Sequence, residues 1–105
     1  MQSAKRFSRI SATNSIFFEC DIQQKLGSYI KQNSTVAHNG KRLCQVSQIS
    51  SIPVIATRHV QKNFGDIDQV ITDVTHPGRR VFDKTLFSMI EPPVVEHLET
   101  MKERN

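Results

Sequence analysis

The stretch "FFECDIQQKL" at residues 17–26 decides the fold, because a short apolar strand ends there on a carboxylate. Residues 15–20 are largely apolar and barely alternate, which predicts a strand that is buried on both faces in a parallel sheet. Asp21 follows directly, with Gln23 close behind it. Such an acid is either an ordinary loop or helix-cap residue or a functional group that the strand holds in a cleft.

Further helices and strands alternate along the rest of the chain. The pattern predicts a helix over 35–50 with an apolar stripe (Val36, Leu43, Val46, Ile49), a strand over 52–57, a loop over 61–65, a helical turn or loop over 67–74, a turn at 76–78, a short strand over 80–82 and a last helix from Pro92. This order is typical of an α/β fold, in which a parallel sheet lies between helices in a Rossmann-like, three-layer arrangement. In such a sheet the second strand lies beside the first.

The 105 residues have room for one domain, preceded by a basic arm. The first 18 residues hold Lys5, Arg6 and Arg9 but no acidic residue. Residues 1–14 therefore read either as a mitochondrial targeting segment or as a plain polar arm, and residues 15–105 as the folded unit. We expect an intracellular protein, mitochondrial or cytoplasmic.

Composition argues against several classes of partner and cofactor. The net charge of +4 is spread over scattered basic residues, and the chain has no Trp and one Tyr, so nucleic acid is not an expected partner. No apolar run approaches the roughly 20 residues of a membrane span. Cys20 and Cys44 form no CxxC pair, and His59 has no second histidine nearby. We therefore expect no metal and no other cofactor.

Polar residues follow all three predicted strands. Asp21 follows the first, His59 the second, and Lys84 lies in "VFDKTLFSM" at residues 81–89. Because the carboxyl ends of parallel strands share one edge of the sheet, we expect Asp21 and Lys84 to face one cleft, about 3–4 Å apart. An ammonium keeps a nearby carboxylate ionised. The residues alone leave open whether this pair is a salt bridge or part of an active site.

The order "FFECDIQQKL … SSIPVIATRH … VFDKTLFSM" resembles the isochorismatase-like cysteine hydrolases, especially their isochorismatase domain-containing subgroup. The resemblance covers residues 15 to about 104. It implies hydrolysis of a small amide, ester or vinyl-ether substrate, with Asp21 as general acid or base and Lys84 as the residue that orients and polarises. Gln23, His59 and Phe87 would line the substrate pocket, although a phenylalanine at this spacing is also typical of a core residue.

The chain departs from the family pattern in its nucleophile. The family's cysteine follows a strand that would come after residue 105, so the chain is expected to be an apparently truncated N-terminal half that holds the Asp and Lys of an Asp-Lys-Cys triad. Cys20 should point away from the cleft into a helix layer, because neighbouring strand residues face opposite sides. Cys44 falls within a predicted helix. Neither cysteine is predicted to replace the nucleophile.

Three functional classes therefore stay open. The chain is an enzyme domain, an inactive or incomplete α/β association module, or a ribonuclease-like protein, since some members of the subgroup are described as mitochondrion-associated ribonucleases. For the enzyme the partner is a small-molecule substrate. A first strand with an open edge also predicts self-association or a homo-oligomer.

Overall fold

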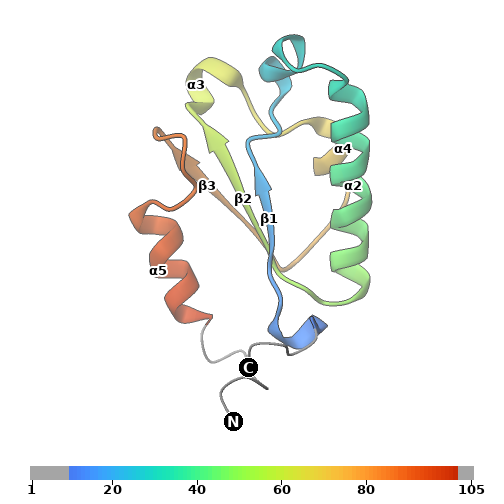
Figure 1. The fold of residues 1–105 in the computed structure, drawn as a ribbon, viewed down its shortest axis with the longest axis vertical. Coiled ribbons are helices and arrows are strands. Elements are labelled where there is room, and N and C mark those ends of the chain that lie inside the picture. Colours follow the sequence, from blue (N-terminus) through green and yellow to red (C-terminus); the bar gives the residue numbers. More distant parts are fainter. Residues whose placement is uncertain (1–9, 102–105) are drawn as a thin grey trace.

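Three parallel strands form the centre of the fold (Figure 1). They are β1 (Phe17–Cys20), β2 (Val54–His59) and β3 (Arg79–Lys84), in the order β1-β2-β3. The structure is a computed structural model that describes residues 10–101. The second strand lies beside the first, as predicted, and the α/β class is confirmed.

Helices lie on both faces of the sheet. The helices of the described residues are η1 (Ala12–Asn14), η2 (Gln24–Tyr29), α2 (Asn33–Ile49), α3 (Gln61–Phe64), α4 (Gln69–Thr72) and α5 (Pro92–Thr100), of which α2, α4 and α5 flank the sheet. In Figure 1, α2 and α4 lie together on one side of the sheet and α5 lies on the other. No helix within residues 10–101 is long and apolar enough to cross a bilayer.

The core lies between β2 and the α2–α4 layer. Ala56, Ile67 and Ile71 form its buried cluster, and Ile22 packs against them. Helix α2 contributes a narrow face of small residues, Ala37, Cys44 and Ser47, which recur at helical spacing. The predicted stripe of Val36, Leu43, Val46 and Ile49 lies on α2, but all four of these side chains are exposed, so the stripe is not the buried face.

Several element boundaries differ from the prediction. The second strand begins two residues later than expected, at Val54, because Pro53 has no amide hydrogen to donate, although its carbonyl still accepts the Phe17 N–H at 3.0 Å. The third strand runs on to Lys84. Residues 61–64, predicted as loop, form the short helix α3, and α4 lies within the ambiguous stretch 67–74. Residues 1–9 of the predicted basic arm lie outside the described residues.

One edge of β1 carries no other strand among the described residues. The amides of Phe17 and Asp21 bond to β2 and its flanking Pro53, at 3.0 and 3.1 Å. Because alternate residues of a parallel strand bond to opposite neighbours, the backbone groups of Phe18 and Cys20 face the open edge. The described sheet therefore offers a short row of unpaired backbone donors and acceptors.

Candidate functional site

Asp21 and Lys84 meet at the carboxyl end of the sheet. Asp21 comes directly after β1, and Lys84 is the last residue of β3. Lys84 Nζ lies 2.7 Å from Asp21 Oδ2, which confirms the predicted proximity. The lysine side chain is 1% exposed and the aspartate side chain 19% exposed, so the pair is largely shielded from water but opens to it on the aspartate side.

The backbone at Asp21 explains how a strand residue turns into the site. Its φ angle of 55° lies in the left-handed region, which Asp adopts more readily than most residues. This conformation ends β1 and breaks its alternation. The carboxylate then reaches across to β2, where Thr57 Oγ1 donates a hydrogen bond to Oδ1 at 2.8 Å. Both carboxylate oxygens are therefore held, one by a hydroxyl and one by an ammonium.

The ammonium of Lys84 has a complete set of short contacts. Besides Asp21, Nζ donates to the carbonyl oxygens of Leu86 at 2.8 Å and Phe87 at 3.0 Å. A lysine has three donors, so these three contacts use them all. The ring nitrogen Nδ1 of His59 lies further away, at 3.5 Å, as a fourth neighbour.

The adjacent acid, Asp83, does not compete for Lys84. Neighbouring strand residues point to opposite faces, and in the register of β2 and β3 Asp83 lies opposite Arg58. Arg58 holds Asp83 through two bonds of 2.6 and 2.9 Å, and it also contacts Asp66 at 3.0 Å. These bonds raise the pKa of Arg58. The charges are thus sorted into two separate groups.

Gln23 continues the pairing of β1 with its side chain. Its Oε1 accepts the backbone N–H of His59 at 2.6 Å, and its Nε2 donates to the carbonyls of His59 at 3.2 Å and Gly65 at 2.8 Å. The side-chain amide therefore takes the place of a strand peptide after Asp21 has turned away. Gln23 is 1% exposed, and its side-chain amide is engaged with the backbone of His59 and Gly65.

His59 lies between two phenylalanine rings. Its ring stacks on Phe87 at 5.2 Å and on Phe64 at 6.0 Å, with interplanar angles of 21° and 16°. Phe87 is 89% exposed, so it is not a core residue. Two of the predicted pocket residues, His59 and Phe87, thus lie together beside Lys84. The group offers a flat apolar surface next to a charged pair.

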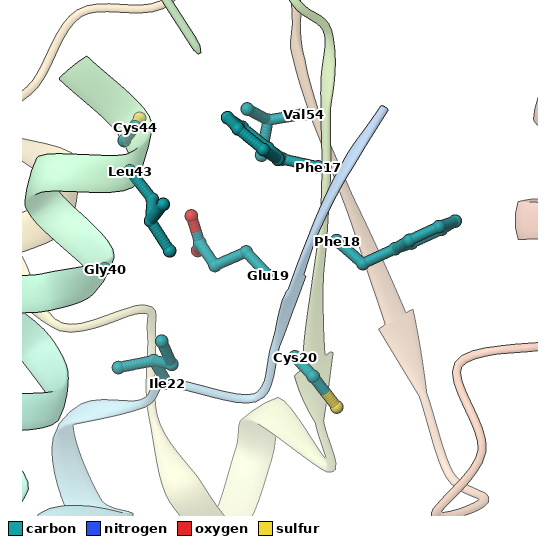
Figure 2. Close-up of a pocket in the computed structure, with 9 residues that line it drawn as sticks. All are labelled: Phe17, Phe18, Glu19, Cys20, Ile22, Gly40, Leu43, Cys44 and Val54. Atoms are coloured by element: carbon teal, nitrogen blue, oxygen red, sulfur yellow. The ribbon is translucent and has the colours of Figure 1, made fainter. Parts of the chain in front are cut away.

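The two cysteines do not supply an activated nucleophile. Cys44 is buried against the sheet, and Cys20 is exposed. The expectation that Cys20 enters a helix layer is wrong: Figure 2 shows Phe17 and Glu19 pointing toward α2, while Phe18 and Cys20 point to the other face, which is open beside β1. Partial burial and then the Asp21 carboxylate raise the pKa of the Cys20 thiol, although Lys84 opposes this. A raised pKa keeps the thiol protonated and weakly nucleophilic.

Two features of the site region had not been predicted. Thr57 is one; its only signal was a hydroxyl residue within an apolar central strand. The other is an ion pair on the α2 face, where Arg79 Nη2 lies 2.6 Å from Glu19 Oε2 and both side chains are about nine-tenths buried. Glu19 also lines a cavity of about 110 Å³ between β1 and α2, whose other walls are mainly apolar (Figure 2).

The possible metal ligands of the described residues are dispersed. Among residues 10–101, no three His, Cys, Asp or Glu side chains lie together as metal ligands would. The histidine nearest the site, His59, has its ring between two phenylalanines and its Nδ1 directed toward an ammonium. A cation would be repelled at that position.

Curated relatives align with this chain over nearly its whole length. Isochorismatase domain-containing protein 2B from Mus musculus is 32% identical over 93 residues, which cover 89% of this chain and 42% of that protein. The secreted isochorismatase effector Isc1 from Phytophthora sojae (strain P6497) is 30% identical over 102 residues, which cover 93% of this chain and 48% of that protein. No protein-family model matches the chain.

Solved structures share the fold as well. The MAR1 ribonuclease from Caenorhabditis elegans superposes with a TM-score of 0.82 at 36% identity, over 88% of this chain and 48% of that one. A putative MAR1 ribonuclease from Leishmania major gives a TM-score of 0.73 at 27% identity, over 88% of this chain and 50% of that one. By sequence and by fold the chain belongs to the isochorismatase-like family, and it spans about half the length of the relatives it matches.

Proposed function

We propose that this chain supplies the Asp and Lys of an isochorismatase-like hydrolytic site that acts on a small amide, ester or vinyl-ether substrate. The observation that carries the proposal is the shielded ion pair of Asp21 and Lys84, 2.7 Å apart at the carboxyl end of the sheet. Ligands of open α/β sheets bind at that edge. The family of the chain supports the same class of chemistry.

Each residue has a role that its contacts support. Asp21 is the only one of the two with an exposed part, so it is placed to take a proton from an attacking group and to return it to the leaving group. Lys84 orients this carboxylate through the contact of 2.7 Å between Nζ and Oδ2. His59 and Phe87 offer the flat surface against which a small substrate would rest. The nucleophile is assigned to a group outside residues 10–101, because the Cys20 thiol is not activated.

The test uses a chimera in which this chain replaces the matching segment of the Mus musculus protein 2B. We expect the chimera to hydrolyse at least one member of a panel of small esters, amides and vinyl ethers. Asp21→Asn and Lys84→Met should each lower kcat/KM by about 10²–10⁴-fold, the range of a positioned acid or base. Steady-state kinetics of purified, folded variants provide the measurement.

Matched controls separate the site from general effects of charge. Asp83→Asn removes the acid next to Lys84 but outside the pair, and it should leave kcat/KM within about threefold, since exposed ion pairs contribute little. The 105-residue chain alone should show no turnover that Cys20→Ser abolishes. Equal activity of the chimera and its Asp21→Asn variant would contradict the proposed roles.

A ribonuclease is the second candidate, because the C. elegans neighbour at 36% identity is a MAR1 ribonuclease. The same chimera should be incubated with single-stranded and duplex RNA. Cleavage of RNA that depends on Asp21 and Lys84, without ester or amide turnover, would favour this candidate. If no substrate of either class is turned over, the chain is better described as an association module.

A further inference from the structure

The turn after β3 is the feature from which a further role follows. Residues 85–90 form no regular helix or strand, yet they provide two of the three acceptors of the buried Lys84 ammonium, Leu86 O and Phe87 O. The two carbonyl groups keep their direction toward Nζ only if other contacts hold the turn in one conformation. Because these carbonyls take two of the three Nζ protons, the conformation of the turn also decides whether the third proton points at Asp21.

Glu91 fixes that turn. Its Oε2 accepts the backbone N–H of Thr85 at 3.1 Å and that of Leu86 at 3.2 Å. Its own N–H donates to Met89 O at 3.0 Å, which closes the turn from the other side. A single carboxylate oxygen thus joins the start of the turn to its end, across five or six residues of chain.

Glu91 is itself held in place by the helix that follows. It is the residue before α5, with an extended backbone, and Pro92 and Pro93 come directly after it. Proline fixes its own φ and restricts the preceding residue to extended conformations. The carboxylate is therefore presented to the turn from a rigid helix start, where a negative charge is also favoured by the helix dipole.

We propose that Glu91 is a positioning residue for Lys84. The carboxylate holds the turn, the turn aims Leu86 O and Phe87 O at Nζ, and the two carbonyls direct the remaining proton of the ammonium at Asp21 Oδ2. The catalytic meaning of this chain of contacts rests on the proposed function. The contacts themselves can be tested without any turnover.

The experiment is competitive acylation of lysines in the folded 105-residue chain with a trace of an acetylating reagent, measured residue by residue by mass spectrometry. Lys84 should react slowly, since it is buried. Glu91→Ala should raise its rate at least about fivefold through local opening, while the rates of Lys25 and Lys31 stay constant. Glu91→Gln, which keeps an acceptor oxygen, should restore slow labelling.

Two further variants exclude a merely structural effect. Glu91→Asp keeps the charge and an acidic helix start but is one methylene shorter, so Lys84 should still react faster than in the parent chain. Glu96→Ala removes an exposed acid from the same helix and should change nothing. An unchanged Lys84 rate in Glu91→Ala and Glu91→Asp, or an equal rise at every lysine, would overturn the proposal.

In the active chimera, Glu91→Ala should lower kcat more than it raises KM, and Glu91→Gln should restore kcat. If Glu91→Ala speeds the acylation of Lys84 but the chimera is inactive, the positioning role stands and the proposed function falls. If the chimera is active but Glu91→Ala leaves the acylation of Lys84 unchanged, the proposed function stands and the positioning role falls.

Discussion

Asp21 shows how one residue's backbone conformation creates a site. If the backbone of Asp21 were extended, its side chain would continue the alternation of β1 between the two faces of the sheet. Its φ of 55° instead turns the backbone out of the sheet. The vacated place in the ladder is filled by the Gln23 amide, and the carboxylate is directed at Thr57 and Lys84. Asp tolerates this conformation because its short polar side chain finds partners locally.

The pairing of Asp21 and Lys84 is predicted from their places at strand ends, because parallel strands bring their carboxyl ends to one edge, and the family resemblance assigns both residues to one site. The sequence did not predict the partners that complete the pair. The Thr57 hydroxyl and the carbonyls of Leu86 and Phe87 depend on register and on the shape of a turn, and neither is encoded in a periodic pattern. Strand-end chemistry is therefore readable from sequence, whereas its hydrogen-bond environment is not.

The unequal burial of the pair predicts unequal effects of removing its two members. Asp21→Asn leaves a fully buried ammonium without its counter-ion and should lower the free energy of unfolding by about 3–5 kcal/mol. Lys84→Met leaves a carboxylate that water can still reach, so the loss should be about 1–3 kcal/mol. Urea denaturation at pH 7 provides both values. Equal losses, or a larger loss for Lys84→Met, would contradict the assignment of the lysine as the more deeply buried partner.

At the scale of elements, the pattern located α2 and the strands better than the helices of one or two turns. Helix α2 was predicted within two residues at its start and one at its end, and β3 within two. The short helices η2 and α3 were missed, because elements of one or two turns are stabilised by tertiary contacts rather than by propensity. The apolar stripe of α2 does not mark its buried face, since small residues let the helix approach the sheet closely while its larger apolar residues stay exposed.

The ion pair between Glu19 and Arg79 connects β1 to β3 across the α2 face of β2. Burial raises the pKa of the Glu19 carboxyl, and Arg79 opposes that rise. One guanidinium nitrogen, Arg79 Nε, is buried without a partner. A buried pair of this kind is sensitive to the loss of either member, and much less so to the loss of both.

We therefore expect Arg79→Met to destabilise the fold by about 3–5 kcal/mol at pH 7. A carboxyl whose pKa is higher in the folded than in the unfolded chain binds its proton more tightly when folded. The free energy of unfolding therefore falls as the pH rises above the ordinary pKa of the group, and it recovers as the pH drops to that pKa. The penalty should shrink as the pH is lowered toward that value, which is 4.5 for Glu. The double variant Glu19→Leu, Arg79→Met should show neither the penalty nor the pH dependence in urea denaturation.

At the scale of the whole molecule, the outstanding feature is that β1 is bare at one edge among the described residues. Phe18 is 52% exposed on the face opposite α2, and its backbone groups face the open edge. Unprotected edges of this kind pair with other strands. We expect the 105-residue chain to self-associate at micromolar concentration, which sedimentation velocity would show.

Phe18→Lys should reduce that association, because charged side chains on an edge strand oppose pairing. Phe87→Lys is the matched control: it removes an even more exposed ring, but from the turn at 85–90 rather than from β1. If the parent chain sediments as a dispersed monomer, or if Phe87→Lys dissociates it as well as Phe18→Lys does, the open edge is not the site of association.

Amide hydrogen exchange should detect the same open edge, because the exchange rates of successive amides along β1 should alternate between slow and fast. In β1, the amides of Phe17 and Asp21 are bonded toward β2 and should exchange slowly, whereas those of Phe18 and Cys20 face outward and should exchange fast. In β2, which has a neighbour on each side, successive amides are all bonded, so protection should be continuous from Val54 to His59. If a partner adds a strand to β1, the amides of Phe18 and Cys20 should become protected as well, so that protection along β1 is continuous. This change would locate the contact without a structure of the complex.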